Sequence, residues 1–190
     1  MPEQNIVSKR RIVLVRHGMP QIEAGIPSAD WKLSADGRAT AAALAGRLGD
    51  FRFSVITSSP EAKAIGTAEA IASRLGLSVT IDDGLAEQSR RSVGFLPREE
   101  VEAGIANLFN NPGQLVFGDE TADMCFTRFG QALDRQLVGC TDDIIAVTHG
   151  TILSIYVSRI CGIDPMPFWR GLGLPAAIVL TGDEMCVVEP

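Results

Sequence analysis

Short apolar runs alternate along the chain with longer segments whose apolar residues recur at helical spacing. This alternation predicts an α/β fold, a three-layer α/β/α sandwich with a mostly parallel central sheet. The last two strands are expected to form a hairpin. The predicted strands are Ile12–Val15, Phe53–Thr57, Leu77–Ile81, Asp143–Thr148, Ala176–Thr181 and Met185–Val188.

Capping residues mark where the predicted helices begin. Ser34 and Thr121 each precede a stripe of apolar residues and are expected to cap a helix. Ser59-Pro60 predicts another helix start, with Ser59 as the cap and Pro60 in the first helical position. That helix is expected to stop at Gly76. Further helices are predicted over Arg98–Phe109 and after Gly150.

The composition is typical of one globular domain. The chain has 190 residues, 46% of them hydrophobic, and a net charge of −6. A chain of this length can bury a sizeable core without a second domain. We therefore expect a single domain over residues 1–190, with a flexible segment at 1–10 and a small cap insertion at 88–118.

The net charge limits the classes of binding partner, and the N-terminal segment and the cysteines bear on the cellular compartment. A negative balance argues against a protein that binds nucleic acid or an anionic membrane, because such proteins need a basic surface. Met1–Arg11 lacks the apolar core of a signal peptide, and no apolar run is long enough to cross a bilayer. The four cysteines are scattered, without a CxxC pair. We expect a cytoplasmic protein.

Both histidines of the chain follow predicted strands in the same local context. His17 and His149 each come one residue after an apolar run, and each precedes a glycine. Parallel strands end at the same edge of a sheet, so both imidazoles are expected in one crevice. A lone histidine at a strand end would more often be a structural residue bonded to a carbonyl. Two in matching positions favour a functional site.

Basic residues close to these histidines predict a pocket for an oxyanion. Arg16 supplies a planar guanidinium that suits two phosphoryl oxygens. Lys63 falls near the amino end of a predicted helix, where free N–H groups favour anions. Each alone would more often be a solvated surface charge, but with the histidines they outline a phosphate-binding site.

Five ordered segments stand out along the chain: Leu14–Gly18, Ser58–Ala68, Leu85–Glu87, Gly118–Thr121 and Val147–Gly150. Together they resemble the histidine phosphatase superfamily, the phosphoglycerate-mutase-like family. A single Arg-His-Gly triplet recurs by chance, whereas five ordered motifs with compatible predicted elements are specific. The resemblance spans Arg11 to Ile160 and implies a compact phosphatase with the family's fold.

The resemblance implies phosphoryl transfer without a metal or cofactor. His17 matches the nucleophile that becomes phosphohistidine. Arg16 and His149 match groups that hold the transferring oxygens. Glu87 matches the acid that protonates the leaving oxygen and then activates water. Outside this context, Glu87 would be expected to pair with a nearby arginine, Arg90 or Arg91.

Lys63, Gly18 and Gly150 complete the expected substrate-binding residues. The family usually has Arg where this chain has Lys63, so a point charge replaces a two-pronged guanidinium. Lys63 should still attract phosphate, but it should orient the phosphate less well than an arginine would. Met19-Pro20 also departs from the family pattern, and this weakens the interpretation as a mutase.

We expect a phosphatase that hydrolyses a small phosphomonoester. The alternatives are phosphoglycerate mutase activity and a phosphate-binding regulatory protein in which Lys63 marks a weakened site. A zinc site formed by His17, His149 and Glu87 ranks last, because neighbouring basic residues would repel the cation.

The substrate itself is not specified by these motifs. A cationic rim would suit a second anionic group. The expected partner is a small phosphorylated molecule, and the apolar C-terminal strands offer a sheet edge for a homodimer. Residues on segments that could rim the pocket are Trp31, Arg90, Arg91, Phe95 and Arg98.

Overall fold

Six strands form one central sheet in the order β3-β2-β4-β1-β5-β6 in a computed structural model that describes residues 10–190. The flexible segment expected at 1–10 lies outside the described residues except for Arg10. The first four strands in this order run parallel, and β5 and β6 join antiparallel. The strands are β1 (Ile12–Arg16), β2 (Phe53–Ser58), β3 (Val79–Ile81), β4 (Asp143–Thr148), β5 (Ala176–Thr181) and β6 (Glu184–Val188).

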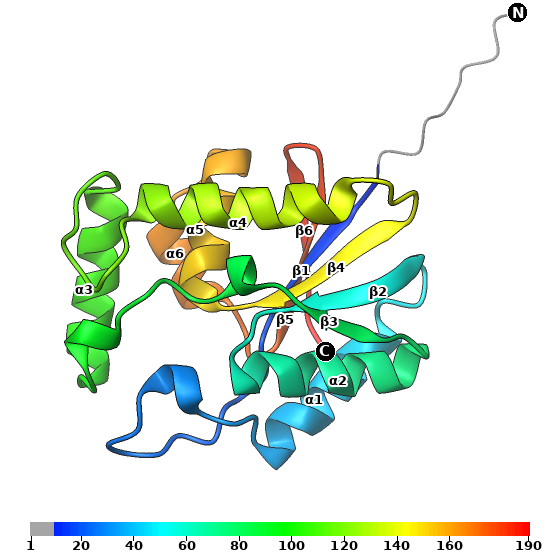
Figure 1. The fold of residues 1–190 in the computed structure, drawn as a ribbon, viewed down its shortest axis with the longest axis horizontal. Coiled ribbons are helices and arrows are strands. Elements are labelled where there is room, and N and C mark those ends of the chain that lie inside the picture. Colours follow the sequence, from blue (N-terminus) through cyan, green and yellow to red (C-terminus); the bar gives the residue numbers. More distant parts are fainter. Residues whose placement is uncertain (1–9) are drawn as a thin grey trace, which may run out of the picture.

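Helices cover both faces of the sheet, which confirms the predicted three-layer sandwich. Figure 1 shows α1 and α2 on one face, α4 and α5 on the other, and α3 beyond the edge where β1 and β4 end. None of the helices within residues 10–190 is both long and apolar enough to span a membrane. The helices are α1 (Ala35–Gly46), α2 (Ala62–Leu75), α3 (Arg98–Asn110), α4 (Ala122–Leu137), α5 (Gly150–Cys161) and α6 (Pro165–Gly171).

Two apolar clusters fill the space between the layers. Alternate residues of β1 point to opposite faces, so Val13 and Val15 pack with α1 and α2, while Leu14 packs with α4 and α5. All three side chains are completely buried. Because both faces of the central strands are covered, β1 and β4 are continuous apolar runs rather than alternating ones.

The start of α2 differs from the sequence prediction. The helix begins at Ala62, its N-cap position is Glu61, and no side chain caps it. The Ser59 hydroxyl instead lies 2.7 Å from Nε2 of His149. The same hydroxyl accepts from the Glu61 N–H at 3.3 Å, before the first helical residue. The prediction that Ser59 caps this helix, with Pro60 as its first residue, is therefore wrong, because the helix starts two residues later and the hydroxyl bonds groups outside it.

Two other elements depart from the sequence prediction. The third strand is only three residues long, Val79–Ile81. The short helix α6 was not predicted; Asp164 caps it by accepting a hydrogen bond from the Met166 N–H at 3.0 Å. Neither change alters the order of the strands that carry the histidines.

Candidate active site

The fold brings both histidines to the ends of neighbouring strands. β1 and β4 pair in parallel, with Arg16 beside Thr148, so His17 and His149 leave the sheet side by side. Their ring centroids lie 5.1 Å apart, with the planes inclined by 61°. His17 is 7% exposed and His149 is completely buried. One small group can therefore touch both rings, as the strand-end pattern predicts.

The ring of His17 is held as a neutral imidazole. Its Nδ1 lies 2.8 Å from the carbonyl oxygen of Gly18, so Nδ1 carries the proton and donates it. Burial, with the charges of Lys63 and Arg16, lowers the pKa of His17 to about 3, although the bond to Gly18 opposes the shift. Nε2 is thus left with a lone pair near neutral pH, as a nucleophile requires.

His149 is fixed through its other nitrogen. Nε2 lies 2.7 Å from the Ser59 hydroxyl, while Nδ1 is buried and has no hydrogen-bond partner among residues 10–190. Burial lowers the pKa of His149 well below its usual value, and the proximity of His17 and Lys63 lowers it further. The sequence analysis missed Ser59 as a partner of this ring. Its place in the Ser58–Ala68 motif was the available signal.

Arg16 lies against the backbone at the start of α5. Its Nη1 donates to the Leu172 carbonyl oxygen at 2.6 Å, and its Nε is buried without a partner among the described residues. Burial lowers its pKa, and the nearby Glu87 carboxylate opposes this shift. A Cβ atom at Gly150 would lie 3.0 Å from Arg16 Nε, so glycine allows the close approach.

Lys63 is buried at the amino end of α2, with 5% of its surface exposed. Its Nζ donates to the Ser28 carbonyl oxygen at 2.7 Å and also to the Glu61 carboxylate. Ser28 belongs to the loop between β1 and α1. The ammonium therefore ties this loop to α2 and is already partly neutralised.

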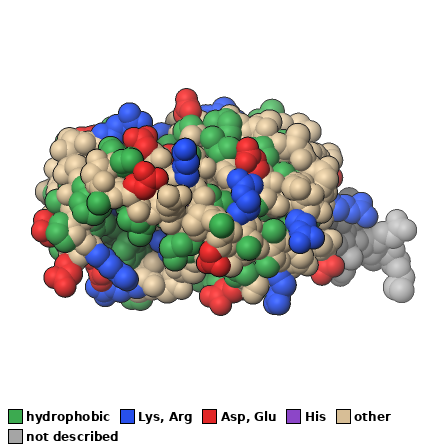
Figure 2. Space-filling view, turned by 90° about the horizontal axis from the view of Figure 1, so that it is seen from below, with side chains coloured by type: hydrophobic (Ala, Val, Ile, Leu, Met, Phe, Trp, Pro, Cys, Tyr) green, Lys and Arg blue, Asp and Glu red, His purple; other side chains and the backbone are tan. Residues whose placement is uncertain are grey.

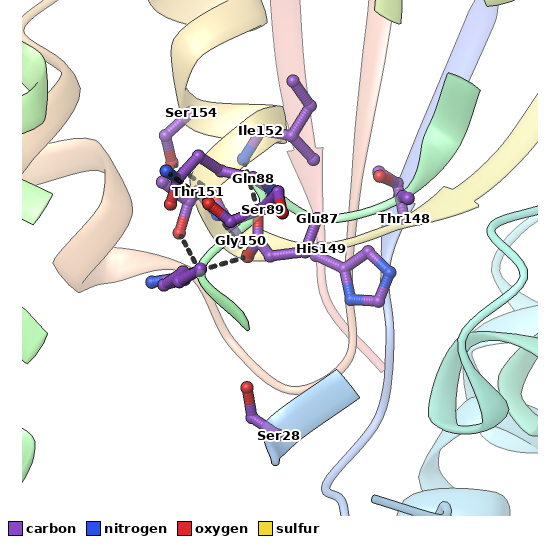
Figure 3. Close-up of polar contacts among 12 residues, drawn as sticks. Ser28, Glu87, Gln88, Ser89, Thr148, His149, Gly150, Thr151, Ile152 and Ser154 are labelled. Carbon is purple, nitrogen blue, oxygen red and sulfur yellow. Dashed lines mark hydrogen bonds and ion pairs between the residues drawn. The ribbon is translucent and has the colours of Figure 1, made fainter. Parts of the chain in front are cut away.

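Glu87 caps α5 from a distant loop. Its Oε1 accepts from the Ile152 N–H at 2.9 Å and its Oε2 from the Thr151 N–H at 3.1 Å (Figure 3). Arg90 Nη2 lies 3.3 Å from Oε2, so the ion pair that the sequence suggested is also present. A helix start leaves N–H groups without partners, and a carboxylate satisfies them. Glu87 thus combines a structural role with its place beside the histidines.

Glu61 is a second carboxylate in this cluster, and the sequence analysis missed it. Its Oε2 accepts from Lys63 Nζ, and its Oε1 accepts from the Glu87 N–H at 3.0 Å. Oε1 also lies 3.4 Å from His149 Nε2. The available signal was an acidic residue two positions before Lys63, inside the motif expected to attract an anion.

Gly18 has a packing role at the end of β1. Its N–H donates to Thr67 Oγ1 at 3.0 Å, so it is not free for a ligand. A Cβ atom there would lie 2.6 Å from the carbonyl oxygen of Gly37. The residue following His17 must therefore be small for α1 to approach the strand end.

The residues of this site are poorly suited to bind a zinc ion. The Glu87 carboxylate is engaged by α5, and the cations of Arg16 and Lys63 lie beside the rings. Within residues 10–190, no three His, Cys, Asp or Glu side chains are grouped so as to hold a metal ion.

A cavity of about 720 Å³ opens over the two histidines. Figure 2 shows hydrophobic side chains around a hollow on the face that carries the loop between β1 and α1. Four of the five residues expected at the rim line this cavity, namely Trp31, Arg90, Arg91 and Phe95. Arg98, on the first turn of α3, does not line it, so that expectation is wrong.

Comparisons with known proteins agree with this geometry. The family model described as the histidine phosphatase superfamily (branch 1) matches residues 12–182. A glucosyl-3-phosphoglycerate phosphatase from Mycolicibacterium vanbaalenii is 25% identical over an alignment of 198 positions, gaps included, that covers 95% of this chain and 88% of the relative.

Solved structures show the same fold at low sequence identity. The mycobacterial glucosyl-3-phosphoglycerate phosphatase in complex with VO3 superposes with a TM-score of 0.74 at 22% identity, over 95% of this chain and 97% of the other. The phosphoserine phosphatase of Entamoeba histolytica in complex with 3-phosphoglyceric acid gives a TM-score of 0.71 at 19% identity, over 95% of each chain.

Proposed function

Because the chain belongs to the histidine phosphatase superfamily, we propose that it is a metal-independent phosphatase that hydrolyses a small phosphomonoester through a phosphohistidine. The observation that carries this proposal is the pair of buried imidazoles, 5.1 Å apart, at the floor of an open cavity. His17 is neutral with Nε2 free, and Arg16 and Lys63 supply positive charge beside it.

In the first step, Nε2 of His17 forms a bond to phosphorus as the ester P–O bond breaks. Negative charge spreads over the phosphoryl oxygens during this transfer, so preorganised donors stabilise the transition state. Arg16, Lys63 and His149 supply these donors. The Nε of Arg16 and Nδ1 of His149, which have no partners among the described residues, add unused hydrogen-bonding capacity at the site.

We assign to the Glu87 carboxyl group the transfer of a proton to the leaving oxygen. Glu87 lines the cavity beside the histidines. In the second step its carboxylate accepts a proton from water, water attacks phosphorus, and the P–N bond breaks. Inorganic phosphate and free His17 are the products. Gly18 and Gly150 serve substrate binding indirectly, by allowing the backbone to pack closely around the site.

Hydrolysis fits the cavity better than mutase chemistry. A mutase must keep water away from its phosphoenzyme. Here the cavity lining includes exposed residues such as Met19 and Phe95, so water can enter the cavity and reach His17, which is 7% exposed. The glucosyl-3-phosphoglycerate phosphatase and the phosphoserine phosphatase that resemble this chain also act on small molecules. The molecule that this chain acts on is therefore expected to be a small phosphomonoester.

Hydrolysis of p-nitrophenyl phosphate in excess chelator tests the proposal. Turnover should persist, and a rapidly quenched reaction with labelled substrate should give a base-stable, acid-labile phosphoprotein. His17→Gln should lower kcat/KM by at least about 10³-fold and abolish the label. Binding of vanadate without turnover of any ester would instead support the phosphate-binding regulatory alternative.

A further inference from the structure

We propose that the substrate carries an apolar group next to its phosphate and that the cavity over the histidines binds this group. The inference rests on the phosphatase function proposed above and names the class of ester that it acts on. The phosphate end is cationic, whereas two of the three arginines in the rest of the lining, Arg90 and Arg128, are paired with carboxylates.

The cavity is much larger than a phosphoryl group. Its volume of about 720 Å³ falls in the range of pockets that enclose a whole small molecule. Apolar side chains from several segments form its walls. Met19, Ile22 and Trp31 come from the loop between β1 and α1, and Phe95, Leu96 and Val101 come from the segment around α3.

Several exposed apolar side chains gather at this cavity. Ile22 is 64% exposed, Phe95 56% and Met124 55%, and all three line it. Met19, also in the lining, is 40% exposed. Exposed apolar residues that gather around one concavity mark a binding surface, because leaving them in water costs free energy that a ligand can recover.

The arginines of the lining are largely satisfied within the protein. Arg90 donates to the Thr151 hydroxyl at 3.1 Å and lies 3.3 Å from the Glu87 carboxylate. Arg128 forms two hydrogen bonds of 2.8 Å to the Glu120 carboxylate. All three nitrogens of Arg128 are engaged within the protein. Arg90 is held through Nη2, and a second anionic group there would have to compete with the adjacent Glu87 carboxylate.

The neutral polar side chains of the lining are engaged as well. Nε2 of Gln88 donates to three carbonyl oxygens, including that of Phe117 at 2.7 Å. Its Oε1 is buried from solvent and has no partner among residues 10–190. The Trp31 indole N–H donates to the carbonyl oxygens of Glu23 and Ile26, which leaves the ring to face the cavity. A polyhydroxylated substrate would thus find few free donors or acceptors.

Arg91 is the residue that would favour a different substrate class, one with a second anionic group. It lines the cavity, is exposed and forms no ion pair with residues 10–190. A substrate with a carboxylate remote from its phosphate could reach it, as the cationic-rim expectation implies. An exposed arginine exchanges water for a ligand at little net gain, whereas buried methylene groups each contribute about 0.8 kcal/mol. We therefore assign substrate selection to the apolar walls.

A series of primary n-alkyl phosphates from ethyl to octyl tests this inference. The leaving alcohols in the series have nearly equal reactivity, so changes in kcat/KM report binding of the chain. We expect kcat/KM to rise about fourfold for each added methylene until the cavity is filled. 3-Phosphoglycerate, with its carboxylate, serves as the polar comparison and should be the poorer substrate.

Variants of residues in the cavity lining test where the apolar group of the substrate binds. Ile22→Ser and Phe95→Ser should each flatten the dependence on chain length, because each removes part of one wall. Leu115→Ser is the matched control: Leu115 is 63% exposed, like Ile22 at 64%, but does not line the cavity. It should leave the slope unchanged.

The outcomes separate the two proposals. Turnover of every ester with no dependence on chain length, or with 3-phosphoglycerate preferred, would overturn the apolar substrate class and leave the phosphatase function standing. No turnover of any ester would overturn both. A slope that Leu115→Ser flattens as much as Ile22→Ser would also overturn the inference, because the effect would not belong to the cavity.

Discussion

A carboxylate oxygen of Glu61 lies 3.4 Å from Nε2 of His149, in the cluster where a phosphoryl group is expected to bind. The other oxygen accepts a hydrogen bond from Lys63, and only 12% of the Glu61 side chain is exposed. An anionic residue therefore neutralises the buried ammonium of the site when no substrate is bound. A phosphoryl group must compete with this internal counterion.

Replacing Glu61 with Gln should strengthen the binding of anions. Loss of one negative charge within a few ångströms of the phosphoryl position should lower the inhibition constants of vanadate and phosphate by about tenfold. Glu69→Gln is the control, since Glu69 lies on the same helix with its side chain 55% exposed. Weaker inhibition in Glu61→Gln would show that Glu61 mainly positions Lys63.

Replacing Glu87 with Gln should reduce both stability and activity. The amide offers one acceptor oxygen, so an N–H at the start of α5 loses its partner, at a cost of about 1–3 kcal/mol in the free energy of unfolding. kcat should fall as well because the amide cannot transfer a proton. Urea denaturation and steady-state kinetics measure the two effects. Full activity in a destabilised variant would remove Glu87 from the chemistry and leave only its capping role.

The buried, neutral His17 should make the protein less stable in acid. Its pKa is about 3 in the folded chain, against 6.5 for the ordinary side chain, so between these values the unfolded chain binds more protons. Stability due to this group is therefore lost as the pH falls below 6.5. Between pH 7 and pH 5 the loss is about 2 kcal/mol.

A comparison of wild type and His17→Gln isolates this contribution. Urea denaturation of both proteins at pH 7 and pH 5 gives the change in the free energy of unfolding. The variant should lose about 2 kcal/mol less than the wild type over this interval. Equal losses would mean that His17 is not held neutral by the fold.

Gly18→Ala should destabilise the protein even though the substitution adds only one methyl group. The new Cβ would lie 2.6 Å from the backbone oxygen of Gly37, which cannot turn away as a side chain would. We expect a loss of about 3 kcal/mol in the free energy of unfolding. Gly46→Ala in α1 is the control, since a Cβ there meets nothing within 4 Å and should be neutral or slightly stabilising. Equal stability of the two variants would contradict the close packing described for Gly18.

Much of the fold could be predicted because its signals are local. β1 and β4 are continuous apolar runs, and each ends one residue before a His-Gly pair. Parallel strands place such ends together, so the proximity of His17 and His149 followed from pattern and general topology. The start of α2 was missed because the Ser59 hydroxyl bonds the His149 imidazole and the Glu61 N–H, while the helix itself begins only at Ala62.

The sequence by itself determined the layered architecture, the two strand-end histidines and the basic residues beside them, since each depends on the order and spacing of residues along the chain. Only the tertiary structure decided that Glu87 caps a helix whose Thr151 is 64 positions away, that Glu61 neutralises Lys63, and that the cavity walls are apolar. The physical reason is that the role of a charged or apolar side chain depends on its neighbours in space. Packing brings these neighbours from distant segments, and no local pattern records them.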